Sequence, residues 1–150
     1  MDYTQVGPSF VQQYYSVFGS ARDQLTGIYR PTSKLTWQGE QMQGQEAIAA
    51  RFQQLAFNEA QFKTDSIECQ PADGGILISV VGEVLLKEER YALKYSDVFI
   101  LSQDEQQQFY VANQIFNLVG GGVDTQGGSG IIEKSEHIYI YLFMVCFRFF

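Results

Sequence analysis

Basic residues are scarce in this sequence of 150 residues. Lysine and arginine total 10 against 17 aspartate and glutamate residues, which gives a formal net charge of −7, and no cluster of basic side chains occurs. A protein that holds a nucleic-acid backbone needs positive charge to neutralise phosphates. The composition therefore argues against a nucleic-acid partner and is better suited to a partner with a basic surface.

Cysteine and histidine are equally rare. Cys69 and Cys146 lie far apart, no CxxC pair is present, and His137 is the single histidine. This excludes a dense disulfide framework and gives no ligand set for zinc, so we expect neither a metal nor another cofactor. Residues 1–8 lack the basic and then apolar regions of a secretory signal, which predicts a protein of the cytosol or nucleus.

Catalytic motifs are also missing. The first 119 residues contain no histidine, and the sequence has no GxSxG, HExxH or phosphate-loop pattern. One enzymatic interpretation stays open: Tyr14 or Tyr15 with Asp97 would supply an oxyanion donor and a base in an apolar cone, as in ketosteroid isomerase. In the alternative interpretation Tyr14 is a core residue and Asp97 faces solvent. We predict no catalytic residues and no enzyme.

Glycine is concentrated late in the chain and marks a boundary. Residues 120–122 and 127–130 form Gly-rich tracts that separate a domain of residues 1–119 from a tail of residues 120–150. Residues 138–147 of the tail are a dense apolar run, shorter than the roughly 20 residues that span a bilayer. Three interpretations stay open for this run: an added strand or partner-binding segment, a weak membrane contact, or an alternative terminus.

The first half of the chain predicts three helices and one strand. Apolar residues at helical spacing indicate helices over residues 8–18, 23–29 and 45–55, with Pro8 in the first turn of the first one. Alternation predicts a strand over residues 35–42, which contains the single tryptophan, Trp37. A tryptophan at a strand–helix junction is either a core residue or the wall of an open pocket.

The second half predicts strands. Extended segments are expected over residues 62–69, 76–86, 91–101 and 109–118, joined by turns at residues 71–75, 87–90 and 103–108. The apolar run 76–86 indicates a central strand covered on both faces. Three helices followed by antiparallel strands predict an α+β domain with a curved sheet wrapped on its helices.

Short pieces spread over residues 1–119 resemble the nuclear transport factor 2 family in both order and spacing. They are residues 10–18 (FVQQYYSVF), 22–25 (RDQL), 28–29 (IY), 35–37 (LTW), 43–44 (QG), 48 (I), 70–71 (QP), 80–82 (VVG) and 113–118 (NQIFNL). The resemblance implies the cone-shaped, cystatin-like fold of that family, in which three N-terminal helices pack on a strongly bent antiparallel sheet. It also implies a homodimer formed through the sheet faces.

The resemblance further implies a carrier that takes the small GTPase Ran, in its GDP form, into the nucleus. An aromatic side chain of Ran enters the mouth of the cone, whose matching positions are Trp37, Leu55, Phe57 and Phe116. Such a carrier moves between cytoplasm and nucleus and concentrates at the nuclear pore.

Further contacts are implied at the rim of the mouth and at the N-terminus. The rim positions are Gln38, Glu88 and Glu89, and Tyr3 matches an aromatic that binds phenylalanine-glycine repeats of nucleoporins. Gln38 stands where the family has a glutamate, and Phe62 replaces a histidine that often faces it. One charged contact to Ran is therefore expected to be missing.

Two other functions of the same fold remain as alternatives. One is an adaptor subunit that forms a heterodimer with an mRNA-export receptor or another partner, because a fold does not by itself fix a function. The other is a small-molecule enzyme of the cone fold.

Overall fold

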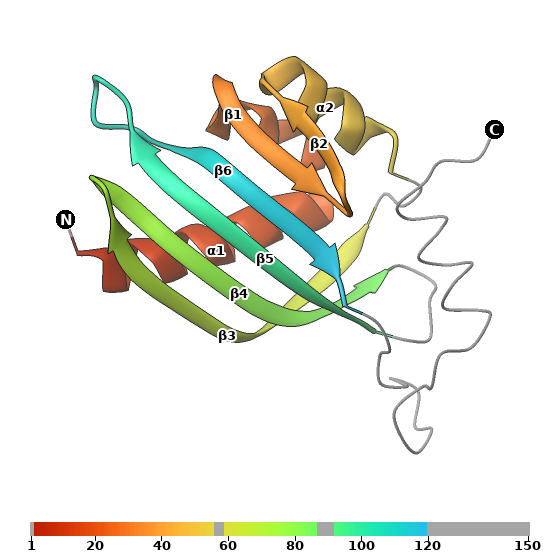
Figure 1. Cartoon of the computed structure of the whole chain (residues 1–150). Helices are drawn as coiled ribbons and strands as arrows, with labels where there is room; N and C mark the ends of the chain where they lie inside the picture. The colour runs from red at the N-terminus through yellow and green to blue at the C-terminus, as the bar shows by residue number, and fades with distance from the viewer. Residues whose placement is uncertain (1, 56–58, 87–91, 120–150) are drawn as a thin grey trace.

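The computed structural model describes residues 2–55, 59–86 and 92–119, and these residues form helices followed by one curved sheet (Figure 1). The helical elements are α1 (Tyr3–Ser20), the 3-10 helix η1 (Arg22–Ile28) and α2 (Gln45–Gln53). This confirms the α+β class and the three helical elements. The single strand predicted over residues 35–42 is instead two antiparallel strands, residues 29–37 and 40–43, joined by a turn at Gln38 and Gly39. The expectations for Phe57, for the charged turn at residues 87–90 and for the tail 120–150 lie outside the described residues.

Helix α1 begins five residues earlier than predicted. The side chain of Asp2 accepts a hydrogen bond from the backbone N–H of Thr4 at 3.1 Å, so Asp2 is the N-cap and Pro8 lies inside the helix. A capping aspartate satisfies N–H groups that the first turn leaves unpaired. Pro8 removes one backbone donor from the second turn, and the helix continues through it because the buried side chains of Val11, Tyr14 and Tyr15 hold it on the sheet.

The six strands form a single sheet in the order β2-β1-β6-β5-β4-β3. Their bounds are β1 Tyr29–Trp37, β2 Glu40–Gln43, β3 Ala60–Ala72, β4 Gly75–Leu86, β5 Leu93–Gln103 and β6 Phe109–Leu118. Most neighbours are antiparallel, as predicted, but β1 and β6 run parallel, with Trp37 opposite Phe116. Alternation along a strand predicts which of its residues share a face. It does not predict which other strand pairs with it, so the sequence does not indicate the parallel pairing of β1 with β6.

Helix α1 lies across the inner face of the sheet, while α2 lies beside β1 and β2 (Figure 1). The core between them is rich in aromatic rings, many of them fully buried. Its largest fully buried side chains are Trp37, Tyr29, Tyr95, Phe18 and Phe99. The β-branched and aromatic composition of the strands suits this half-buried surface.

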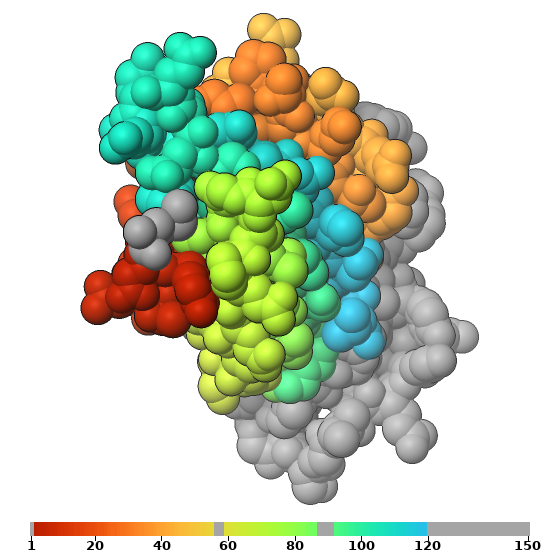
Figure 2. Space-filling view, turned by 60° about the vertical axis from the view of Figure 1, so that its left-hand side comes forward, coloured from red at the N-terminus to blue at the C-terminus, as the bar shows by residue number. Residues whose placement is uncertain are grey.

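The outer face of the sheet corrects the expectation that β4 is covered on both sides. Residues of β4 alternate between buried positions such as Ile78 and Val80 and open positions such as Val81, which is 40% exposed. Figure 2 shows this outer face with β3, β4, β5 and β6 side by side. An apolar strand with one exposed face has the same sequence pattern as a fully buried strand, because leucine and valine occupy both of its faces.

None of the helices among residues 2–55, 59–86 and 92–119 combines the length and the hydropathy needed to cross a lipid bilayer.

Candidate functional site

The site that the sequence predicts lies at one end of the sheet. Strands β1, β4 and β6 end there, β3 and β5 begin there, and the C-terminal turns of α1 cover it. Side chains that point inward from these strand ends enclose a small apolar cavity, here called the mouth cavity. It is lined by Phe18, Trp37, Phe62, Val84, Leu86, Leu93, Phe116 and Leu118.

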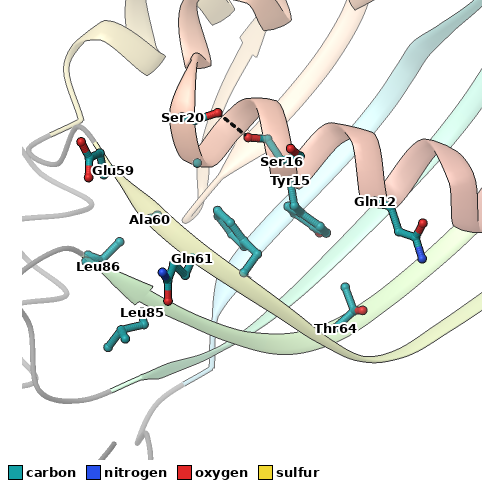
Figure 3. A pocket seen from close by; sticks show the side chains of 12 residues that line it. Gln12, Tyr15, Ser16, Ser20, Glu59, Ala60, Gln61, Thr64, Leu85 and Leu86 are labelled. Atoms are coloured by element: carbon teal, nitrogen blue, oxygen red, sulfur yellow. Dashed lines mark hydrogen bonds between the residues drawn. The ribbon is translucent and has the colours of Figure 1, made fainter.

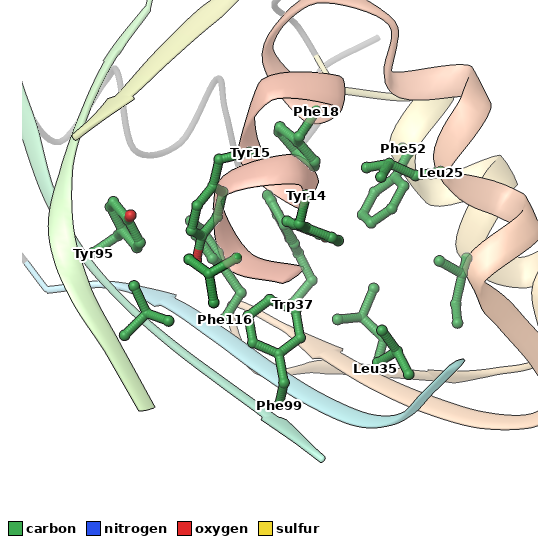
Figure 4. Packing of buried hydrophobic residues seen from close by; sticks show 14 of the residues in the cluster. Tyr14, Tyr15, Phe18, Leu25, Leu35, Trp37, Phe52, Tyr95, Phe99 and Phe116 are labelled. Carbon is green, nitrogen blue, oxygen red and sulfur yellow. The ribbon is translucent and has the colours of Figure 1, made fainter. Parts of the chain in front are cut away.

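Two of the predicted residues form the floor of the mouth cavity. The rings of Trp37 and Phe116 stack with their centroids 4.1 Å apart and their planes at 12°. The parallel pairing of β1 with β6 places the two residues directly opposite each other, and Phe18 stacks on Trp37 from α1 at 5.8 Å (Figure 4). The stacked rings make the floor of the mouth cavity aromatic.

The mouth cavity is smaller than the resemblance implies. Its volume is ≈ 10 Å³, and Trp37 is only 2% exposed. About 10–15 Å³ is what a single water molecule needs, so an aromatic ring does not fit into this cavity as it stands. Trp37 is therefore both a core residue and a cavity wall, and the expected wide hollow is absent from the described residues.

The other predicted residues divide into four groups. Leu55 is buried in the same core cluster but does not line the mouth cavity. Gln38 follows Trp37, and its backbone N–H donates to the carbonyl of Phe116 at 2.9 Å, which places it at the rim. Phe57, Glu88 and Glu89 lie outside the described residues. Tyr3, by contrast, lies at the far end of α1, about 22 Å along the helix from Phe18.

Six wall residues were not predicted as site residues. They are Phe18, Phe62, Val84, Leu86, Leu93 and Leu118. Each sits within about four residues of the end of a predicted helix or strand, and the strand residues belong to the inward-facing set. The sequence thus contains a usable signal: inward-facing apolar residues at strand ends that meet at one edge of a sheet.

Trp37 also brings an unusual polar atom to the floor. Its indole Nε1 is buried and has no hydrogen-bond acceptor among the described residues, and the same holds for Nε2 of the adjacent Gln38. Buried donors are normally paired, and an unpaired one raises the free energy of the folded state. A hydrogen-bond acceptor from a partner would satisfy either N–H group.

A second cluster lies in the core behind the cavity walls, and its residues do not line the mouth cavity. Asp97 of β5 accepts hydrogen bonds from Tyr15 Oη at 2.9 Å and from Gln114 Nε2 at 3.1 Å. Gln114 Oε1 in turn accepts from Tyr29 Oη at 2.6 Å, and Tyr29 lies 3.0 Å from the hydroxyl of Tyr14. This network joins α1, β1, β5 and β6.

The interpretation that Asp97 faces solvent is wrong, because Asp97 is only 1% exposed. Burial raises the pKa of its carboxyl well above the usual value, although the hydrogen bonds from Gln114 and Tyr15 act in the opposite direction. Burial likewise raises the pKa of Tyr15. The pairing that an isomerase would use is therefore present, but Asp97 lines neither the mouth cavity nor the groove described next.

A larger depression of ≈ 950 Å³ runs between α1 and the first half of β3 and is here called the side groove (Figure 3). Its wall on the helix comes from Gln12, Tyr15 and Ser16, and its other wall includes Phe62 and Leu85. Amide and hydroxyl groups and the carboxylate of Glu59 lie among apolar side chains in this lining, so the groove suits a polar chain that carries a few apolar groups.

These features define a class of protein. A helix lies in the concave face of a bent six-stranded sheet, and an apolar cavity sits where the strand ends meet, which is the cone-shaped α+β fold used both by binding proteins and by enzymes.

The comparison with known proteins identifies the family. The family model for the nuclear transport factor 2 (NTF2) domain matches residues 6–118. Nuclear transport factor 2 of Neurospora crassa is 40% identical over 120 residues, which are 79% of this chain and 97% of that protein. The structure of Ntf2 from Cryptosporidium parvum is 38% identical, has a TM-score of 0.74, and the match covers 77% of this chain and 94% of that one. The chain belongs to the nuclear transport factor 2 family.

More distant solved structures share only the fold. They include the Mtr2–Mex67 M domain complex of C. albicans (16% identity, TM-score 0.62, 77% of this chain and 93% of that chain) and a putative ketosteroid isomerase of Parabacteroides distasonis (9% identity, TM-score 0.65, 77% and 89%). The related chains at 38–40% identity are transport factors, whereas the fold itself also occurs in proteins described as enzymes.

Proposed function

We propose that this protein is a non-enzymatic carrier that binds Ran in its GDP form and takes it into the nucleus. The observation that carries the proposal is the mouth cavity, in which Trp37 stacks on Phe116 in an aromatic wall at the end of the sheet. Membership of the nuclear transport factor 2 family supports a role in nuclear transport, and Ran-GDP is the partner that the resemblance implies.

The mouth cavity offers a partner two kinds of interaction. Its aromatic walls suit an aromatic anchor, and buried aromatic anchors dominate the binding energy of many interfaces. The unpaired Nε1–H of Trp37 and the Nε2–H of Gln38 suit a backbone carbonyl beside that anchor. We assign the pocket contact to Trp37 and Phe116 with Leu55 behind them, and we keep Phe57 as a proposed fourth member.

The rim contributes charge. The net charge of −7 favours a partner with a basic surface, and Glu88 and Glu89 are the proposed acidic contacts. Gln38 at the rim is neutral, so it offers a hydrogen bond where the family has a charge. We therefore expect a larger share of the binding energy to come from apolar contacts.

The N-terminal end of α1 is the proposed site for phenylalanine-glycine repeats. Tyr3 is partly buried against the core there, which leaves part of its ring open for a phenylalanine. Binding to nucleoporins would concentrate the protein at the nuclear pore between cytoplasm and nucleus.

The outer face of the sheet is the proposed surface for pairing with a second copy of the chain. Val98 of β5 lies directly opposite Ile115 of β6, and Leu77 of β4 lies opposite Ile100, so an apolar patch runs across three strands. Ile115 is 48% exposed. At one edge of this face Lys94 forms ion pairs with Glu83 at 2.8 Å and with Asp65 at 3.3 Å.

Replacing Ile115 with glutamate is expected to convert the dimer into a monomer. Two copies of the charge would meet within an apolar interface, where an unpaired charge is strongly unfavourable. Sedimentation or light scattering of the full chain measures the change in mass. The control is Gln13→Glu, which adds a negative charge on an exposed side chain of α1, on the other side of the sheet from the patch. A wild-type chain that is monomeric until an mRNA-export receptor is added would instead indicate the adaptor function.

Capture of purified Ran loaded with GDP or with GTP tests the carrier proposal. We expect retention with GDP and none with GTP. The double variant Glu88→Lys, Glu89→Lys is expected to weaken retention more at low salt than at high salt, because a rim contact is screened by ions. Equal retention of both nucleotide forms, or none of either, contradicts the proposal.

A further inference from the structure

The mouth cavity and the side groove lie on opposite sides of the same side chains. The cavity has a volume of ≈ 10 Å³ and the groove one of ≈ 950 Å³. Phe62 and Leu86 line both of them. A movement of one of these side chains from the cavity towards the groove would therefore enlarge the cavity without displacing a strand.

Phe62 is the side chain best placed to make this movement. Of the eight residues that line the mouth cavity, only Phe62 and Leu118 are partly exposed, and Leu118 does not reach the groove. Leu86 reaches both spaces but is 2% exposed. Rotation about the χ1 bond of Phe62 redirects the ring by about 120° and leaves the backbone pairing of Phe62 with Val84 in place.

The ring of Phe62 is held in its present place by other aromatic rings. It stacks on Tyr15 with centroids 4.6 Å apart at 17°, and it meets the rings of Phe18 and Tyr95 edge to face at 5.3 and 5.5 Å. Tyr15 is itself fixed by its hydrogen bond to Asp97. The floor rings of Trp37 and Phe116 are held separately by their own stacking, so Phe62 can move while the floor stays in place.

We propose that Phe62 is the gate of the mouth cavity: its ring turns into the side groove and opens a space above Trp37 that admits an aromatic side chain of the partner. The proposal rests on the carrier function for the identity of the partner. It resolves the difference between a cavity that fits about one water molecule and a partner that inserts a ring. It also gives Tyr15 and Asp97 a role as positioning residues that keep the gate closed.

Quenching of tryptophan fluorescence by acrylamide tests the gate directly, because Trp37 is the single tryptophan of the chain. In Phe62→Ala the constant for quenching of Trp37 by acrylamide is expected to rise by a factor of about two to ten. This is the factor by which losing an aromatic contact of ordinary strength changes an equilibrium between a closed and an open cavity. Phe62→Leu, which keeps an apolar side chain, is expected to give a smaller rise. It replaces the alanine variant in this test if the alanine variant does not fold.

Phe10→Ala is the matched control. Phe10 is also a partly buried phenylalanine between α1 and the sheet, where it contacts Tyr14 and Phe99, but it does not line the cavity. Its loss should leave the quenching of Trp37 at the wild-type value. An equal rise in the Phe10 and Phe62 variants, or no rise in either Phe62 variant, overturns the gate.

Adding Ran-GDP separates the gate from the carrier function. If quenching rises in Phe62→Ala and Ran-GDP binds no form of the protein, the gate stands and the carrier function fails. If Ran-GDP binds the wild type and Phe62→Ala with equal rates while quenching is unchanged, the carrier function stands and the gate is wrong. A gate predicts faster association of Ran-GDP with Phe62→Ala, because no ring has to move first.

Discussion

Replacing Trp37 with alanine is expected to lower the free energy of unfolding by about 3–5 kcal/mol, as for other large-to-small changes of buried aromatic residues. The indole is 2% exposed and stacks on both Phe116 and Phe18, so its removal leaves a large apolar void at the end of the core. A domain of this size is stable by only about 5–15 kcal/mol, which makes this loss a large fraction of the total.

Urea unfolding followed by far-UV circular dichroism measures this loss, since the variant has no tryptophan to observe. Trp37→Phe is the control, because it keeps an apolar ring against Phe116 and should lose much less. A loss below about 1 kcal/mol in the alanine variant would show that the stacked floor contributes little to the core. Because Trp37→Ala is expected to be less stable, unfolding alone could prevent it from binding Ran-GDP. The folded fraction of the variant therefore has to be measured before a loss of binding is assigned to the pocket.

Asp97 is expected to make the stability of this protein fall as the pH rises from about 4 towards neutrality. Burial raises the pKa of Asp97 in the folded state above its value in the unfolded chain. The folded state therefore holds a proton that the unfolded state has lost, and each pH unit in that interval costs about 1.4 kcal/mol. The contribution is complete below the unfolded pKa of 3.8 and disappears as the pH passes the folded pKa.

The variant Asp97→Asn removes this titration while it keeps an oxygen that accepts from Tyr15. The difference in unfolding free energy between wild type and variant, measured by urea unfolding between pH 4.5 and 7.5, should therefore change with pH in favour of the variant at higher pH. Asp104→Asn is the control: a hydrogen bond from the backbone N–H of Gln108 lowers the pKa of Asp104, so its contribution to stability is present above about 3.8 and is lost only below it, and the difference from wild type should stay constant between pH 4.5 and 7.5. A constant difference for Asp97→Asn would show that its folded pKa is not raised.

The sequence predicted most of the strands because their alternation is clear. Residues 109–118 were predicted as a strand with the bounds that β6 has in the structure. The start of α1 was missed, since the interpretation relied on Pro8 and overlooked the capping aspartate at position 2. Local sequence patterns predict local structure only. The parallel pairing of β1 with β6 depends on contacts between residues about 80 positions apart, so such patterns do not predict it.

The candidate site was predicted only in part, and the reason is geometric. Trp37 and Phe116 were singled out by the resemblance, and the structure stacks them. The size of the cavity depends on how Phe62 and its neighbours fill the space, which no pattern in the sequence specifies. The burial of Asp97 was also missed, because an aspartate in an alternating strand is usually placed on the solvent side.

The strand order β2-β1-β6-β5-β4-β3 has a consequence for synthesis on the ribosome. The last strand of the domain is inserted between an early hairpin and the later strands, so the hairpin of β1 and β2 has no neighbour in the sheet until residue 118 has been made. A nascent chain that stops at residue 103 holds two separate sheet fragments with open edges, which are prone to pair wrongly. The six-stranded sheet can therefore be completed only after the last of these strands, β6, has been made.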